Sequence, residues 1–167
     1  MKNLITIAVD AMGGDGSPHK IIKGISEHNK KNKNIFYRLF GNKNEISKFL
    51  PKELDQNCLE IIHTDQQIEG TDTPLGAAKK GKNTSMWLAI ESVKEKKSDI
   101  IISAGNTGAL LVISKLNLKM IENIDKPALS GLWPSKKGMS VVLDLGANIE
   151  CNEKNLIDFS IMGASLF

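Results

Sequence analysis

Three glycine-rich polar segments hold the residue types in this chain that could bind an oxyanion, and each follows a short apolar run. They are residues 10–18 after 4–9, residues 103–108 after 100–102, and residues 144–148 after 141–143. Glycines let backbone N–H groups approach an anion, and the N-terminus of a following helix adds partial positive charge. The ends of parallel strands lie at one edge of a sheet, where ligands bind. We therefore predict one cleft, with phosphate as the favoured ligand.

The first two segments combine backbone and side-chain groups at glycine turns. Their candidate binding residues are Asp10, Gly13, Gly14 and Asp15, followed by Ser103, Gly105, Thr107 and Gly108. In residues 103–108, the side-chain donors of Ser103, Asn106 and Thr107 stand beside two glycines at a helix start. That combination suits a tetrahedral oxyanion better than an extended nucleotide, and Asn106 and Thr107 could hold a phosphate directly. A simpler interpretation of each segment stays open, in which the polar side chains only cap the backbone N–H groups of a turn or helix.

A lysine group and three further polar positions complete the candidate site. Lys79 and Lys82 precede Ser85 at another helix start, where they could neutralise a phosphate or form a solvated basic face. An aspartate at a strand end, such as Asp144, can orient a substrate, hold a cation or brace its loop. The residues for which we predict catalytic roles are Asn106, Asp144 and Asn148.

Other catalytic patterns do not occur in the sequence. The glycine segments match neither the P-loop nor the G-x-G-x-x-G fingerprint, so nucleotide binding is not indicated. No serine lies in a G-x-S-x-G elbow, and His19, His28 and His63 have no spacing typical of a metal site or a triad. We expect neither a metal nor a cofactor.

Composition favours a globular protein without a nucleic-acid surface. The 167 residues carry a net charge of only +3, and Arg38 is the one arginine among mostly scattered lysines. Cys58 and Cys151 lack a C-x-x-C spacing, and we expect free thiols in a reducing compartment. The N-terminus has no signal-like segment, and no stretch is long and apolar enough to span a bilayer. We therefore predict a cytoplasmic protein.

Apolar patterning predicts an α/β fold. Strands are expected over residues 4–9, 35–40, 59–63, 100–103, 128–132 and 140–144, with helices between most of them. Thr73 before Pro74, and Asn152 before Glu153, are expected helix caps. The apolar pattern of the last helix continues to Phe167, which favours a chain that is the front part of a longer protein. We predict a single α/β domain over residues 1–167.

Five motifs resemble one protein family in order and spacing. They are residues 7–15 (IAVDAMGGD), 84–86 (TSM), 103–110 (SAGNTGAL), 126–129 (KPAL) and 143–148 (LDLGAN) followed by Cys151. On these motifs the chain is identified as a member of the PlsX family, the bacterial acyl-ACP:phosphate acyltransferases. One departure is the segment before Thr84, usually rich in arginine in the family, where Lys79, Lys80 and Lys82 keep the charge but not the bidentate phosphate recognition.

The resemblance implies a fold, an activity and partners. The fold would be a three-layer α/β/α arrangement with a mostly parallel sheet, as in isocitrate and isopropylmalate dehydrogenases, and this chain would be the N-terminal portion of a longer PlsX-type chain. The activity would be formation of acyl phosphate from fatty acyl-acyl carrier protein and inorganic phosphate, in phospholipid synthesis. Family members form homodimers and contact the membrane peripherally. The resemblance places much of the dimer surface, and the helices that contact the membrane, in the half that this chain lacks.

Two other functions stay open at this point. A half-length chain could be a non-catalytic remnant that binds phosphate or a partner subunit. The same scaffold could also serve a phosphotransacetylase-like enzyme on another substrate. The glycine motifs favour the acyltransferase over the phosphotransacetylase-like enzyme, whereas only the chain length separates the acyltransferase from the remnant.

Overall fold

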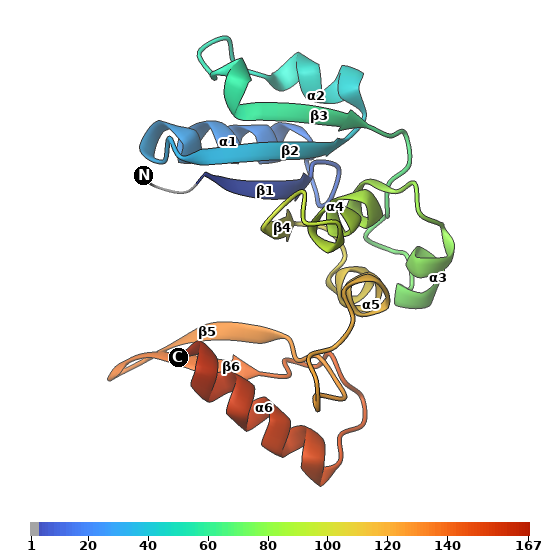
Figure 1. The fold of residues 1–167 in the computed structure, drawn as a ribbon, viewed down its shortest axis with the longest axis vertical. Coiled ribbons are helices and arrows are strands. Elements are labelled where there is room, and N and C mark those ends of the chain that lie inside the picture. The colour runs from blue at the N-terminus through green and yellow to red at the C-terminus, as the bar shows by residue number, and fades with distance from the viewer. Residues whose placement is uncertain (1–3) are drawn as a thin grey trace. The chain divides into compact units, whose positions relative to one another are not determined.

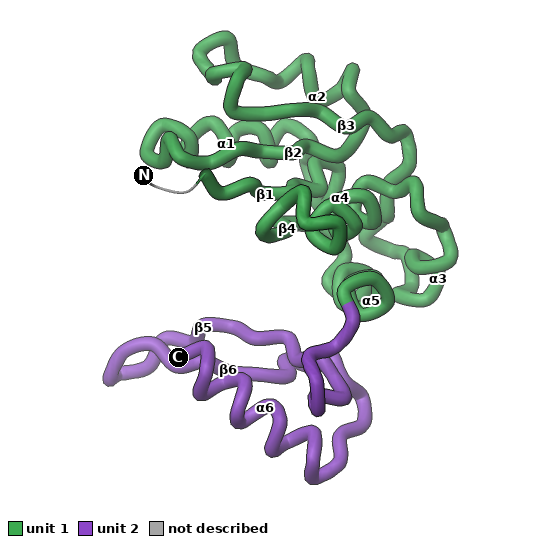
Figure 2. Tube along the Cα trace, viewed as in Figure 1, with its two compact units in different colours: residues 1–118 green, residues 119–167 purple. Residues whose placement is uncertain are grey.

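The computed structural model describes residues 4–167, which form two compact units that meet in sequence between Leu118 and Lys119 (Figure 2). The first unit alternates strands and helices (Figure 1). Its elements are β1 (Ile5–Asp10), α1 (His19–Lys31), β2 (Ile35–Gly41), α2 (Lys43–Phe49), the short 3-10 helix η1 (Gln56–Cys58), β3 (Leu59–His63), α3 (Pro74–Lys79), α4 (Ser85–Lys94), β4 (Ile100–Ser103) and α5 (Thr107–Leu118).

The sheet of the first unit has four parallel strands in the order β3-β2-β1-β4, which confirms the predicted parallel α/β fold. Strand β1 is central, and its last residue, Asp10, lies beside Phe40 of β2 and Ser103 of β4 in the register. Because β1 and β4 end at the same level, the segments that follow them leave the sheet side by side. This alignment brings residues 10–18 next to residues 103–108.

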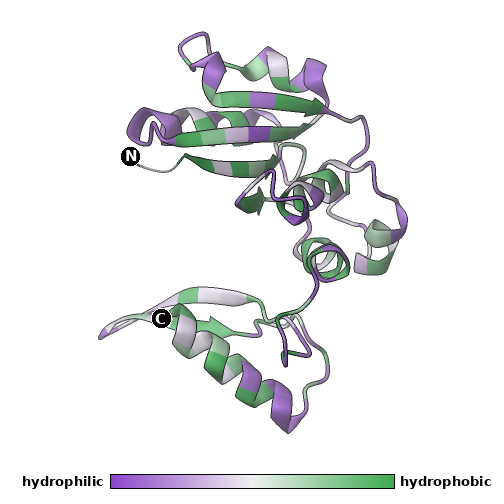
Figure 3. Ribbon diagram, in the orientation of Figure 1, coloured by the Kyte–Doolittle hydropathy of each residue, from purple (hydrophilic) through white to green (hydrophobic). Residues whose placement is uncertain are grey.

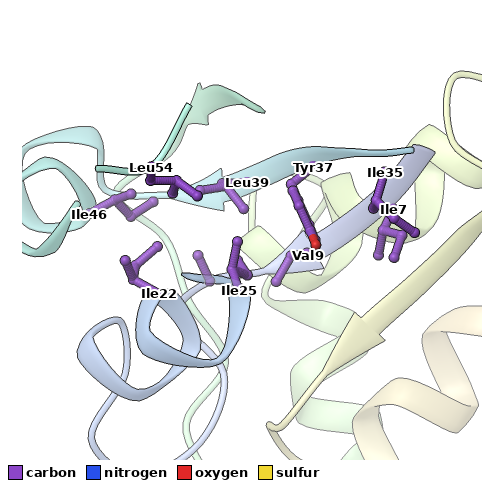
Figure 4. Packing of buried hydrophobic residues seen from close by; sticks show 10 residues of the cluster. Ile7, Val9, Ile22, Ile25, Ile35, Tyr37, Leu39, Ile46 and Leu54 are labelled. Carbon is purple, nitrogen blue, oxygen red and sulfur yellow. The ribbon is translucent and has the colours of Figure 1, made fainter. Parts of the chain in front are cut away.

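Helices cover both faces of this sheet, so the first unit has three layers. On one face, Val9 and Leu39 pack with Ile22 and Ile25 of α1, as Figure 4 shows. On the other face, Ala8 and Phe40 pack with Ala89 of α4. Successive strand residues thus bury opposite sides, as expected for a sheet covered twice.

Local capping chemistry decides where the helices next to the site begin. Thr84 caps α4, because its side chain accepts a hydrogen bond from the backbone N–H of Trp87. The predicted cap Thr73 accepts from the N–H of Gly76, with Pro74 in the first turn of α3. The strand predictions in this unit are therefore confirmed to within a few residues, as is the predicted cap Thr73.

The second unit consists of a β-hairpin and one helix. Strands β5 (Ser130–Ser135) and β6 (Gly138–Leu143) pair antiparallel, and helix α6 (Glu153–Leu166) begins at the predicted cap Asn152. The prediction that residues 141–143 belong to the parallel sheet is wrong. Only two residues join the paired ends Ser135 and Gly138, and so short a connection permits only antiparallel pairing.

Helix α6 carries apolar residues along its length (Figure 3), and only some of them are buried. Phe159 is buried, and a Cβ on Gly163 would lie 2.7 Å from Leu143 of β6. Ile161, Leu166 and neighbouring apolar side chains stay exposed. Among residues 4–167, no helix combines the length and the apolar character needed to cross a bilayer.

Candidate functional site

The carboxylate of Asp10 joins three elements of the first unit under the glycine segments. Asp10 is only 1% exposed at the end of β1. Its Oδ1 accepts a hydrogen bond of 2.6 Å from Ser85 Oγ at the start of α4, and its Oδ2 accepts one of 2.7 Å from Ser103 Oγ at the end of β4. The Ser103 oxygen in turn accepts from the backbone N–H of Gly105 at 3.1 Å. Asp10 and Ser85 therefore lie beneath the glycine segments and hold them in place.

The first two glycine segments touch each other through their backbones. A Cβ on Gly13 would lie 2.9 Å from the nitrogen of Gly105, and a Cβ on Gly14 would lie 2.4 Å from the carbonyl oxygen of Ala104. Gly14 also has a φ of +88°, which side chains rarely allow. The predicted meeting of these two segments is therefore what the structure shows. The third segment, around Gly146, belongs to the second unit, and its predicted place in the same cleft stays a prediction.

A cleft of about 610 Å³ opens above the joined segments. Its lining comprises Met12, Gly14, Asp15 and Ser17, then residues 104–108, and finally Glu45 with residues 67–70. Thr107 and Gly108 form the first turn of α5, where backbone N–H groups are free of intrahelical partners. The cleft thus combines helix N–H groups with the carboxylates of Asp15, Glu45 and Glu69.

Asn106 has all its side-chain hydrogen-bonding groups engaged with the backbone. Its Nδ2 donates to the carbonyl oxygens of Gly70 at 3.1 Å and Asp72 at 2.8 Å. Its Oδ1 accepts from the N–H of Ala109 at 2.9 Å, which caps α5. The side chain is therefore a contact between protein segments in this structure.

The predicted lysines do not line the cleft. Lys79 and Lys82 are exposed, at the end of α3 and in the turn after it. Lys80 lines an adjoining hollow of about 580 Å³ and forms an ion pair of 2.6 Å with Asp72. The end of another lysine, Lys20, lies over the first glycine segment, since a Cβ on Gly16 would be 3.3 Å from its Nζ. Sequence reasoning passed over Lys20 because one lysine on a helix carries no motif.

In the second unit, Asp144 and Asn148 form one hydrogen-bonded loop. The backbone N–H and the Nδ2 of Asn148 both donate to Asp144 Oδ1, at 3.1 and 2.9 Å. Cys151 Sγ lies 3.4 Å from Asp144 Oδ2. The hydrogen bonds from Asn148 hold the pKa of Asp144 below its usual value. The alternative of a loop-bracing aspartate therefore has direct support, while the catalytic roles of Asp144 and Asn148 stay predictions.

Comparison with known proteins gives the family. The model of a family described as "Fatty acid synthesis protein" matches residues 5–167. The chain belongs to this family. The resemblance to PlsX proteins drawn from the five motifs is thereby confirmed.

The relatives from the fatty acid synthesis family are longer than this chain. A phosphate acyltransferase of Pelagibacter ubique is 72% identical over 167 residues, which are 100% of this chain and 50% of that protein. Phosphate acyltransferases of Paramagnetospirillum magneticum and Rhodospirillum rubrum are 39% and 41% identical over 165 residues each, 98% of this chain and 47% of theirs. The chain thus spans about half the length of these relatives.

One segment that lines the cleft was not predicted from the sequence. Residues 64–73 follow the end of β3 and supply four residues of the cleft lining, among them Glu69 and Gly70. The signal was present, because this segment also follows a strand of the parallel sheet and contains a glycine. Across residues 4–167, no group of three or more histidine, cysteine or acidic residues is arranged to hold a metal ion.

Burial raises the pKa of Asp10, while hydrogen bonds from Ser85, Ser103 and the backbone oppose that shift. A raised pKa means that the folded chain binds this proton more tightly than the unfolded chain does. Ionisation of Asp10 therefore lowers stability as pH rises from the ordinary carboxyl pKa through the raised one.

Replacement of Asp10 by asparagine removes this pH-dependent step. We expect the free energy of unfolding of the wild type, minus that of Asp10→Asn, to fall as pH rises through the same window and then to level off. Urea unfolding of both proteins at a series of acidic to neutral pH values measures the difference. A difference that grows with pH would show that the hydrogen bonds to the carboxylate outweigh its burial.

Proposed function

We propose that this chain is the N-terminal half of an acyltransferase that makes acyl phosphate from fatty acyl-acyl carrier protein and inorganic phosphate. The observation that carries the proposal is the contact between the Gly13–Gly14 and Ala104–Gly105 backbones beside the first turn of α5. Backbone N–H groups and a helix N-terminus at one place suit a phosphate group. The names of the relatives, phosphate acyltransferase, support the same activity.

The reaction needs positioning more than a protein nucleophile. A phosphate oxygen attacks the carbonyl carbon of the thioester, the new C–O bond forms as the C–S bond breaks, and the carrier leaves as its thiol after taking up a proton. N–H groups of the glycine segments, with the Thr107 hydroxyl, would hold the phosphate in line for this attack. Asp10, Ser85 and Ser103 would act from below by fixing those N–H groups.

The acidic residues that line the cleft indicate that phosphate binding needs an additional positive charge. Asp15, Glu45 and Glu69 line the cleft, and their carboxylates oppose the approach of a phosphate dianion. We propose that Lys20, whose side chain crosses Gly16, supplies positive charge at the first glycine segment. Lys79 and Lys82, which are exposed and outside the cleft, are proposed instead to meet the acidic acyl carrier protein.

The same proposal includes the family's cellular setting. We propose a cytoplasmic homodimer that contacts the membrane peripherally, with the membrane contact in the part of the relatives that this chain does not cover. The non-catalytic remnant is the competing function, and such a remnant would bind phosphate at the same glycine segments without transfer, or would bind a partner subunit.

A chimeric protein tests whether this chain supports acyl transfer to phosphate or only binds phosphate. Residues 1–167 would replace the corresponding half of the Pelagibacter ubique phosphate acyltransferase, which is 72% identical over that span. We expect the chimera to form acyl phosphate from palmitoyl-acyl carrier protein and inorganic phosphate, detected as the hydroxamate after trapping with hydroxylamine. The parent relative is the positive control. A chimera that matches the parent in circular dichroism and oligomeric state, yet forms no hydroxamate, would identify the chain as a remnant.

A further inference from the structure

One wall of the cleft is a segment with no helix or strand of its own. Residues 64–73, here called the wall segment, connect β3 to α3, and four of them line the cleft. A segment of this kind keeps its position only if other elements hold it. The hydrogen bonds that hold it therefore decide the width of the cleft opposite the second glycine segment.

Asn106 binds the wall segment at two backbone positions. Its amide has two hydrogens, and Nδ2 donates to the carbonyl oxygens of Gly70 and Asp72, at 3.1 and 2.8 Å. Its oxygen is used in the opposite direction, to cap α5 through the N–H of Ala109. One side chain thus joins the start of α5 to the wall segment.

Two further contacts hold the same end of the wall segment. Asp72 Oδ2 accepts from the backbone N–H of Glu69 at 2.8 Å and pairs with Lys80 Nζ at 2.6 Å. Pro74, which follows the segment, packs against Gly108 so closely that a Cβ there would lie 2.8 Å from its Cγ. These contacts fix residues 69–74, and Asn106 adds the two side-chain hydrogen bonds that connect them to the second glycine segment.

We propose that Asn106 is a positioning residue, which fastens the wall segment to the start of α5 and so sets the distance between the Glu69–Gly70 wall and the phosphate-binding N–H groups. The proposal deepens the proposed function and rests on it for its catalytic consequence. It replaces the direct contact with phosphate that the sequence suggested for Asn106, because both amide hydrogens are already donated to carbonyl oxygens.

Asparagine and aspartate differ here in one useful way. Aspartate caps a helix as well as asparagine does, so Asn106→Asp keeps the acceptor for Ala109. It also places an oxygen where the amide donated, facing the carbonyl oxygens of Gly70 and Asp72. Asn106→Ser keeps a capping oxygen and loses the donors without adding repulsion. Asn152→Asp is the matched control, since Asn152 caps α6 through its side-chain oxygen.

Hydrogen exchange of the purified chain tests the fastening without any substrate. Within residues 67–73, the backbone N–H groups of Glu69 and Asp72 donate hydrogen bonds inside the wall segment. We expect these two amides to exchange roughly ten- to hundredfold faster in Asn106→Asp and Asn106→Ser, because the two hydrogen bonds that fasten the segment are lost. Amides in the middle of α5 keep their protection, and Asn152→Asp leaves residues 67–73 unchanged. Unchanged exchange of residues 67–73 in both Asn106 variants would overturn the proposal, whatever the activity of the chain.

Kinetics of the chimera test the consequence for the site. We expect Asn106→Asp to raise the KM for inorganic phosphate about tenfold, with a smaller change in kcat, and Asn106→Ser to raise it less. Faster exchange with an unchanged KM in both variants would show that the fastening does not serve phosphate binding, and would overturn the positioning role. Absence of activity in the unsubstituted chimera would instead count against the proposed function and leave the exchange result to decide the fastening.

Discussion

Gly14→Ala is expected to destabilise the chain by about 2–4 kcal/mol, whereas Gly24→Ala is expected to stabilise it by about 0.5–1 kcal/mol. The two substitutions add the same methyl group to glycines of the same unit. They differ in backbone conformation and in what surrounds the added atom, so the pair isolates the contact between the glycine segments.

At Gly14 the added Cβ meets two obstacles. The φ of +88° is strained for alanine, and the Cβ would lie 2.4 Å from the carbonyl oxygen of Ala104. That oxygen belongs to the backbone of the second glycine segment, so it can retreat only if the two segments part. Gly24 lies within α1, and a Cβ there would meet nothing within 4 Å among the described residues, so alanine gains helix propensity without a clash.

Urea unfolding of the three proteins measures both changes. The expected order of stability is Gly24→Ala, then wild type, then Gly14→Ala, with similar m-values. A chain in which Gly14→Ala is as stable as the wild type would show that residues 10–18 and 103–108 do not touch. A phosphate titration followed by NMR would then be expected to perturb only one of the two segments.

The parts of the site that local chemistry decides could be predicted from the sequence. Thr73 and Asn152 cap helices as expected, because an oxygen at the cap and an N–H within the first turn lie three residues apart in any chain. The first two glycine segments could also be predicted, because each follows an apolar run typical of a buried strand. The structure then places the ends of these strands, β1 and β4, side by side.

The hydrogen bonds of Asp10 with Ser85 and Ser103, beneath those segments, could not be predicted in the same way. Asp10, Ser85 and Ser103 were each singled out as candidate ligands, but the structure uses all three together, and Asp10 lies 75 and 93 residues from its partners. Such contacts depend on how α4 and β4 pack against β1, which no local pattern specifies. Asn106 shows the same limit, because its partners Gly70 and Asp72 lie 36 and 34 residues away.

The hairpin of the second unit shows a signal that was present and overlooked. Lys136 and Lys137 stand between two apolar runs and precede Gly138, whose φ is +128°. A two-residue connection followed by glycine favours an antiparallel hairpin over a strand of the parallel sheet. Residues 141–148 share the strand-then-glycine pattern of β1 and β4, and that pattern alone does not distinguish a hairpin strand from a parallel one.

Asp10→Ala is expected to cost about 3 kcal/mol or more, because it leaves two donors without their acceptor. The hydroxyls of Ser85 and Ser103 both donate to this carboxylate. Loss of the carboxylate also releases the Ser103 oxygen that holds the N–H of Gly105. Asp15→Ala is the matched control, since Asp15 lies in the same segment with an exposed side chain, and its loss should cost at most about 0.5 kcal/mol.

A double-mutant cycle shows whether the network acts as one unit. Ser85→Ala alone leaves a buried carboxylate with one donor fewer, for a cost of about 1.5–3 kcal/mol. Once Asp10 is already alanine, the hydroxyl of Ser85 has no acceptor left to lose, so the same serine substitution should cost little. The cost of the double variant should then fall short of the sum of the single costs by about 1.5–3 kcal/mol. Costs that add fully would mean that Asp10 and Ser85 stabilise the chain separately, and that the carboxylate does not join α4 to the glycine segments.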